Sequence, residues 1–139
     1  MPILLRWQDD KKVTLYCEVE GEWSLDDAWN NLNGTILDYI NSVSYVPDII
    51  INFTPTNYTP SGLLSFWRRA YQWMQEHGVV TSIVIFVDVP PAMRGIGDTL
   101  RNLRVPIMRY MFFVESVEEG QTLIDNLRKD SPRQRLNND

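Results

Sequence analysis

The hydrophobic pattern of the first twenty residues predicts a β-hairpin. Apolar and polar side chains alternate strictly over residues 13–20, and a short apolar run covers residues 3–7. Alternation with a period of two and one polar face is typical of a half-buried strand. The polar segment between the two runs supplies the turn, so we expect the first strand to pair with the second.

Four later segments carry apolar residues three and four positions apart, which is the period of an amphipathic helix. Ser24 can cap the first of them, and Ser116 with Glu119 forms a capping box for the last. Thr59 and Pro60 are interpreted as the N-cap and the first residue of the second helix. The predicted helices cover residues 25–41, 61–77, 91–103 and 116–128.

Three continuous apolar runs alternate with these helices, over residues 48–53, 82–87 and 110–114. Such runs are typical of strands that are covered on both faces. Because strands that alternate with helices require right-handed crossovers, the core sheet should be parallel. We therefore expect one α/β domain over residues 1–129, with the order ββαβαβαβα and a mixed, mostly parallel sheet of four to five strands flanked by helices. Residues 130–139 are polar, and we expect them to form a disordered tail.

The composition excludes several kinds of chemistry. The chain has one cysteine, Cys17, and one histidine, His77. A single cysteine rules out an internal disulfide, and these two residues leave too few ligands for a soft-metal site and too few groups for a hydrolase triad. The paired carboxylates, such as Asp26 and Asp27, lie in turns and at helix starts, and their pattern is not that of a catalytic acid/base pair. We therefore expect no enzyme activity, no metal and no cofactor.

The net charge of −5 is unevenly distributed. Residues 1–60 carry three basic and nine acidic side chains, whereas residues 61–114 carry six arginines and three acidic side chains. An acidic chain is a poor candidate for binding nucleic acid or an anionic membrane. The apolar runs are far shorter than the roughly 20 residues of a membrane-spanning helix, and the N-terminus lacks the layout of a signal peptide. We expect a cytoplasmic protein that neither binds nucleic acid nor inserts into membranes.

The central arginines form a first candidate binding surface. Arg68 and Arg69 fall on the polar side of the second predicted helix, and Arg94 and Arg101 lie on one face of the third. If both helices cover the same side of the sheet, these side chains form one basic patch. Such a patch suits an acidic protein partner or a phosphorylated ligand. The alternative is a solvated face without a partner.

Trp73 has two interpretations, because it lies in the second predicted helix near the polar residues Gln72 and Gln75. An exposed tryptophan beside Arg68 or Arg69 would resemble the anchor of a protein interface. Alternatively, Trp73 covers the end of the sheet.

The loop after the strand at 48–53 is the second candidate surface. Ligands of open α/β sheets bind at the carboxyl ends of the strands, and the free N–H groups of a helix N-terminus favour an anion. Hydroxyl and amide side chains are concentrated in this loop, although they could also serve only as turn and cap residues. They are Asn52, Thr54, Asn57, Tyr58, Thr59 and Ser61, followed by Gly62.

The sequence from Ile49 to Leu64, IIINFTPTNYTPSGLL, resembles the signature of STAS domains, the family of sulfate transporters and anti-sigma-factor antagonists. That signature is an apolar strand, an acidic residue, a short loop, and then Asp-Ser-Ser/Thr-Gly-Leu at the start of a helix. The order of the elements also fits over residues 13–128, while literal identity is confined to Ser61-Gly62-Leu63. The resemblance implies a STAS-like fold and a noncatalytic regulatory module that binds proteins.

The sequence departs from this signature at the position where the family is phosphorylated. Asn52 replaces the acidic residue, and Thr59 and Pro60 stand at the Asp-Ser pair. In the family the hydroxyl beside the Asp accepts phosphate, which a proline cannot do. The resemblance therefore implies a divergent branch without the usual phosphorylation switch. Ser61, at the second hydroxyl position, is still a candidate for phosphorylation because a helix N-terminus stabilises the added charge.

Two functions are consistent with these patterns. The first is a regulatory module that binds a protein through the loop at 54–62, the second helix and the arginines. The second is a domain that binds a small molecule or anion in a pocket over the carboxyl ends of the strands. Several tryptophans are also consistent with a homodimer. The pocket of the second function would be lined by Asn52, Thr54, Tyr58, Ser61 and Arg94.

Overall fold

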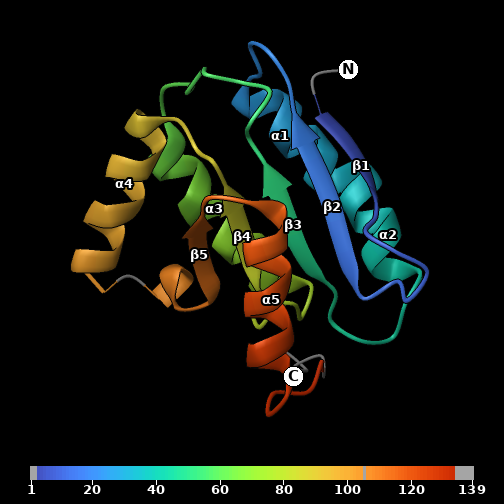
Figure 1. Cartoon of the computed structure of the whole chain (residues 1–139). Helices are drawn as coiled ribbons and strands as arrows, with labels where there is room; N and C mark the ends of the chain where they lie inside the picture. The colour runs from blue at the N-terminus through green and yellow to red at the C-terminus, as the bar shows by residue number, and fades with distance from the viewer. Residues whose placement is uncertain (1–2, 105, 134–139) are drawn as a thin grey trace.

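The computed structural model describes residues 3–104 and 106–133, and within them five strands form one sheet (Figure 1). The strands lie side by side in the order in which they occur in the chain. The first pair is antiparallel, and each later strand is parallel to the one before it. The predicted mixed, mostly parallel sheet is therefore confirmed. Its strands are β1 (Ile3–Trp7), β2 (Thr14–Val19), β3 (Asp48–Asn52), β4 (Val84–Val87) and β5 (Met111–Val114).

Helices cover the two faces of the sheet unequally (Figure 1). α1 to α4 lie on one face, and α5 lies on the other. No helix in the described ranges is long and apolar enough to cross a membrane. The helices are α1 (Leu25–Asn31), α2 (Leu37–Asn41), α3 (Leu63–Glu76), α4 (Pro91–Asn102) and α5 (Val117–Arg128), with a π-helical segment η1 (Leu32–Ile36) and a 3-10 turn η2 (Pro106–Tyr110).

The alternation of side chains along the strands gives each face of the sheet its own core. On β3, Ile50 packs with Ile85 and Ile124 beneath α5. The neighbouring Ile49 and Ile51 belong to the opposite core, to which both α3 and α4 contribute. These two helices therefore lie on the same side of the sheet (Figure 1), which is the condition for a single basic patch.

The first predicted helix is present but is not a continuous α-helix. Its start is capped as expected, because Ser24 Oγ accepts the N–H of Asp27 at 3.0 Å while the Asp27 carboxylate accepts the N–H of Ser24 at 3.0 Å. Seven residues later the helix widens into the π-helical segment η1, which contains Gly34, before it continues as α2. The periodicity of the sequence predicted the helix but not this local change in winding.

The second predicted helix begins later than expected. α3 starts at Leu63, and its N-cap is Gly62, whose φ of 82° lies in the left-handed region. Glycine adopts this conformation without the steric cost of a side chain. The prediction that Thr59 caps the helix and Pro60 opens it is wrong, because the left-handed turn at Gly62 separates both residues from the first helical turn.

Trp73 is a core residue and not an exposed anchor. Its side chain is buried with Ile36 and Ile40 of the α1–α2 segment. The indole N–H donates to Asn33 Oδ1 at 3.1 Å. The neighbouring Gln72 and Gln75 do not indicate that Trp73 is buried, because the helix that covers this side of α3 comes from a distant part of the chain.

The predicted disordered tail begins with residues that contact the domain. Arg133 forms an ion pair with Asp48, and its carbonyl accepts the N–H of Val46 at 2.7 Å. Arg128, at the end of α5, also pairs with Asp48. The carboxylate of Asp48 is fully buried, and a buried charge requires such partners. Part of the segment predicted as a tail therefore contacts the domain, while residues 134–139 lie outside the described ranges.

Two glycines of α4 should respond oppositely to an added methyl group. A Cβ at Gly97 would overlap the ring of Phe113, whereas a Cβ at Gly95 would meet no atom within 4 Å. We expect Gly97→Ala to destabilise the protein by about 1–3 kcal/mol. Gly95→Ala should stabilise it by up to about 1 kcal/mol because alanine favours the helix. Urea denaturation measures both effects, and a similar result for the two variants would contradict the packing of α4 against Phe113.

Candidate functional site

Asn52 ends β3 and shapes the first turn of the loop that leads to α3. Its Oδ1 accepts the N–H of Thr54 at 3.0 Å, and its Nδ2 donates to the hydroxyl of Tyr16 at 3.0 Å. That hydroxyl donates in turn to Glu18 at 2.9 Å. Burial raises the pKa of Tyr16 above its ordinary value, which favours the neutral hydroxyl that donates this hydrogen bond. Asn52 therefore has partners within the protein at both ends of its amide group.

The middle of the loop is fixed to the segment that follows β2. The indole N–H of Trp23 donates to the carbonyl of Tyr58 at 3.0 Å. The hydroxyl of Thr56 donates to the carbonyl of Gly21 and accepts the N–H of Tyr58 at 3.1 Å. The backbone of the loop is thus held in place from two points, while several of its side chains are left on the surface.

The exposed side chains of the loop continue onto the first turn of α3. Tyr58 is 39% exposed and Leu64 is 47% exposed. Thr59 differs from its neighbours, because its hydroxyl is buried and has no hydrogen-bond partner among the described residues. The sequence-predicted residues that reach the surface here are Thr54, Asn57, Tyr58, Ser61 and Gly62.

Leu64 was missed by sequence reasoning, although the pattern contained a signal for it. The apolar stripe of α3 contains Leu63 and Trp67, which are buried. Leu64 falls outside that stripe and lies four residues before the exposed Arg68. Residues four apart share one face of a helix, so Leu64 and Arg68 extend the exposed surface of the loop along α3.

The two arginines of α3 have different surroundings. The guanidinium of Arg69 lies 4.3 Å from the centre of the Trp29 ring, a cation–π contact. Trp29 also packs edge-on against Phe66 of α3. Arg68 is exposed on the outer side of the helix.

The arginines of α4 are directed toward β5 instead. Arg94 lies 3.9 Å from the Glu115 carboxylate and 5.4 Å from the centre of the Phe113 ring. Arg101 donates to the carbonyl of Met111 at 2.7 Å. These contacts orient Arg69 toward α1, and Arg94 and Arg101 toward β5. The single basic patch that the helical spacing suggested stays a prediction.

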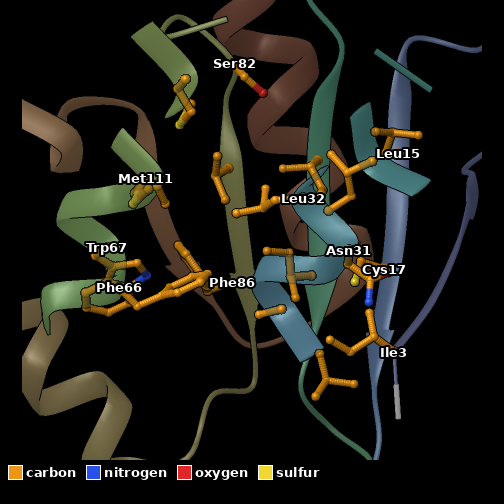
Figure 2. A pocket seen from close by; sticks show the side chains of 18 of the residues that line it. Ile3, Leu15, Cys17, Asn31, Leu32, Phe66, Trp67, Ser82, Phe86 and Met111 are labelled. Atoms are coloured by element: carbon orange, nitrogen blue, oxygen red, sulfur yellow. The ribbon is translucent and has the colours of Figure 1, made fainter. Parts of the chain in front are cut away.

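A cavity of about 160 Å³ lies between the sheet and the helices of the α1–α4 face (Figure 2). Apolar side chains from all five strands, the α1–η1–α2 segment and α3 form most of its wall, as Figure 2 shows for Leu32 of η1, Phe66, Trp67 and Phe86. The sequence-based pocket over the carboxyl ends of the strands is a different site. None of the five residues predicted to line that pocket borders this cavity.

Cys17 lies on the wall of the cavity, and we expect its thiol to be unreactive in the folded protein. Burial raises the pKa of Cys17 to about 12, so the reactive thiolate is nearly absent at pH 8. Reaction with Ellman's reagent at pH 8 should be slower in the native protein than in urea by a factor of about 1,000, because the raised pKa leaves much less thiolate in the folded state. Similar rates in the two conditions would contradict the burial of this thiol.

With these elements and contacts in place, the fold is STAS-like: a single α/β domain with a mostly parallel five-stranded sheet. The structure is similar to that of the Bacillus cell fate determinant SpoIIAA in its phosphorylated form, with a TM-score of 0.52 and 17% sequence identity. The match covers 90% of this chain and 100% of the SpoIIAA chain. At this identity the likeness is one of fold.

Comparison of the sequence with protein-family models gave no match, and neither did comparison with curated proteins. The similarity is therefore carried by the arrangement of the elements.

Proposed function

We propose that this protein is a noncatalytic, cytoplasmic regulatory module that binds a protein partner, as anti-sigma-factor-antagonist domains do. The observation that supports this most is the exposed surface formed by the loop at 54–62 and the outer face of α3, on a STAS-like fold. We call this the loop–α3 surface and define it by Tyr58, Ser61, Leu64 and Arg68.

The loop–α3 surface has the composition of a protein interface. Tyr58 and Leu64 are two of the large apolar side chains that are exposed on the described part of the chain. Tyrosine and arginine are enriched among the residues that dominate binding energies. The backbone beneath Tyr58 is held by Trp23, so its ordering costs little conformational entropy when a partner binds.

The partner should bind without the phosphorylation switch of the family. Pro60 stands where the family has its phosphoacceptor, and Ser61 precedes the N-cap Gly62 instead of lying in the first turn of α3. We expect Ser61→Ala and Ser61→Asp to change partner affinity by less than about threefold, because an exposed charge outside the helix contributes well under 1 kcal/mol. Loss of binding in Ser61→Asp alone would show that Ser61 acts as a switch.

Site-specific photocrosslinking in the native host tests the proposed surface. A benzophenone amino acid at position 58 or 64 should give an adduct with one protein. The same probe at Leu127, which is 37% exposed on α5 and lies on the opposite face of the sheet, is the matched control and should give none. An adduct at position 127 without one at 58 or 64 would place the interface elsewhere.

Homodimerisation and binding of a small anion stay predictions.

A further inference from the structure

The two faces of the central strand are packed to different degrees. Ile50, which faces α5, is completely buried. Ile49 and Ile51 face the other helices and are only half-buried, although β3 is the middle strand of the sheet and has a strand on each side. Water-sized access to side chains in the middle of a core shows that the space above them is not filled. The cavity of about 160 Å³ lies against these two side chains.

At other points the helices approach the sheet closely, whereas the space above Ile49 and Ile51 is not filled. On the α5 side, Gly120 allows such close contact that a Cβ there would lie 2.8 Å from Ile85 Cγ2. On the other side, Gly97 of α4 lies directly against Phe113. α1 and η1 are instead joined to α3 above the cavity, through Trp29 with Phe66 and through Asn33 with Trp73. These contacts hold α1, η1 and α3 together above the cavity, and the space between these helices and β3 stays unfilled.

The π-helical segment contributes to the wall of this cavity. Leu32 and Ile36, the first and last residues of η1, both line it. π-helical turns are rare and occur frequently at functional sites. The unusual winding and the unfilled space therefore coincide in the same part of the fold.

Among the described residues, the wall carries no charged side chain, and two of its polar side chains have partners within the protein. Ser82 Oγ donates to the carbonyl of Pro47 at 2.7 Å, and Asn31 Nδ2 donates to the carbonyl of Asp27 at 3.0 Å. The Cys17 thiol is neutral. A cavity with so few free polar groups is a poor site for ordered water and a good one for an apolar molecule.

We propose that this cavity is a binding site for a small, uncharged, apolar molecule of the size of one aromatic ring. An engineered apolar cavity of about 150 Å³ in another protein binds benzene and xenon, and the volume here is similar. The half-buried residues Ala28, Leu32, Phe66 and Met74 line the cavity on the side formed by α1, η1 and α3. This site is separate from the loop–α3 surface and does not depend on the proposed function.

Benzene is the probe for the test, with the full chain and two variants that fill the cavity from opposite walls. Ile51→Phe adds volume from the sheet, and Ala28→Leu adds it from α1. Leu64→Phe is the matched control, because it places a phenyl group on the exposed side of α3. Thermal unfolding with increasing benzene and methyl NMR spectra of the folded protein measure binding.

In the wild type and in Leu64→Phe, benzene should raise the Tm and increase the folding equilibrium constant about elevenfold at ten times its Kd. The two filling variants should lose most of this response. A wild type without a Tm increase or methyl shifts would overturn the proposal, and so would filling variants that respond like the wild type. If both filling variants fail to fold, xenon decides the question in the wild type. Shifts at Ile49 and Ile51 support the site, and their absence overturns it.

Discussion

Asp48→Asn is expected to destabilise the protein by about 3–5 kcal/mol, the usual cost of removing one partner of a buried ion pair. The Asp48 carboxylate is fully buried and accepts the N–H of Ile83 at 2.9 Å. Arg128 binds both carboxylate oxygens, Oδ2 through Nε at 3.1 Å and Oδ1 through Nη2 at 2.5 Å, and Arg133 also binds Oδ2. An asparagine keeps the shape but leaves two guanidinium groups without a counter-charge. Urea denaturation measures the loss.

Asp125→Asn is the control for this prediction, because Asp125 is exposed on α5 and pairs only with Gln121 among the described contacts. It should change the free energy of unfolding by less than about 0.5 kcal/mol. A cost of Asp48→Asn no larger than that of this control would contradict the role of Asp48 as the centre of a buried ion pair. It would then follow that the end of α5 and residues 131–133 do not close over the start of β3.

Phe86→Ala is expected to cost about 3–5 kcal/mol, the range for removing a fully buried phenyl ring. Phe86 is at the centre of the aromatic contacts on the α1–α4 face. Its ring centre lies 6.1 Å from that of Phe53, 5.9 Å from that of Trp67 and 5.3 Å from that of Phe113. Because Phe86 also lines the cavity, the space that its ring vacates would join an existing void.

Phe112→Ala is the matched comparison for this second prediction. Phe112 lies on the neighbouring strand β5, belongs to the opposite core and is only half-buried. Removing the Phe112 ring leaves a smaller cavity, so the loss in the free energy of unfolding should be clearly smaller than for Phe86→Ala. Thermal or urea unfolding of the two variants measures the difference. Equal costs would contradict the central position of Phe86.

The fold could be predicted because its main signals are local in the sequence. The alternation over residues 13–20 and the continuous apolar runs determine which segments are half-buried and which are covered on both faces. The N-cap at Ser116 is also local, and the structure confirms it with the Glu119 N–H donating to Ser116 Oγ at 3.1 Å. The reciprocal half of the predicted capping box differs, because the Glu119 carboxylate accepts the N–H of Glu115 at 3.1 Å. Features of this kind need only a few neighbouring residues to be recognised.

The features that sequence reasoning missed depend on contacts between distant segments. Asp48 was part of an apolar run, and its partner Arg128 lies 80 positions later. Trp73 is buried because a helix about 40 positions earlier covers it. The cavity has no sequence signal at all, since an apolar side chain that lines a void has the same periodicity as one that is packed.

The candidate site was predicted in part. The residues after Asn52 form an exposed loop that leads to α3, as the sequence indicated. The direction of each arginine did not follow from helical spacing, because Arg69 and Arg94 are oriented by aromatic rings on α1 and β5. Periodicity assigns a side chain to a face of its helix, and the neighbours of that face become known only from the tertiary structure.

The binding affinity of the crosslinked partner, measured with charge-reversed variants, tests the central claim most directly. Arg68→Glu lies on the loop–α3 surface, and Lys129→Glu makes the same change at an exposed residue just after α5. If the partner binds through the loop–α3 surface, Arg68→Glu should raise Kd at least about tenfold, or 1.4 kcal/mol, and Lys129→Glu should leave it unchanged. An unchanged Kd for Arg68→Glu, together with a raised Kd for Lys129→Glu, would contradict the account.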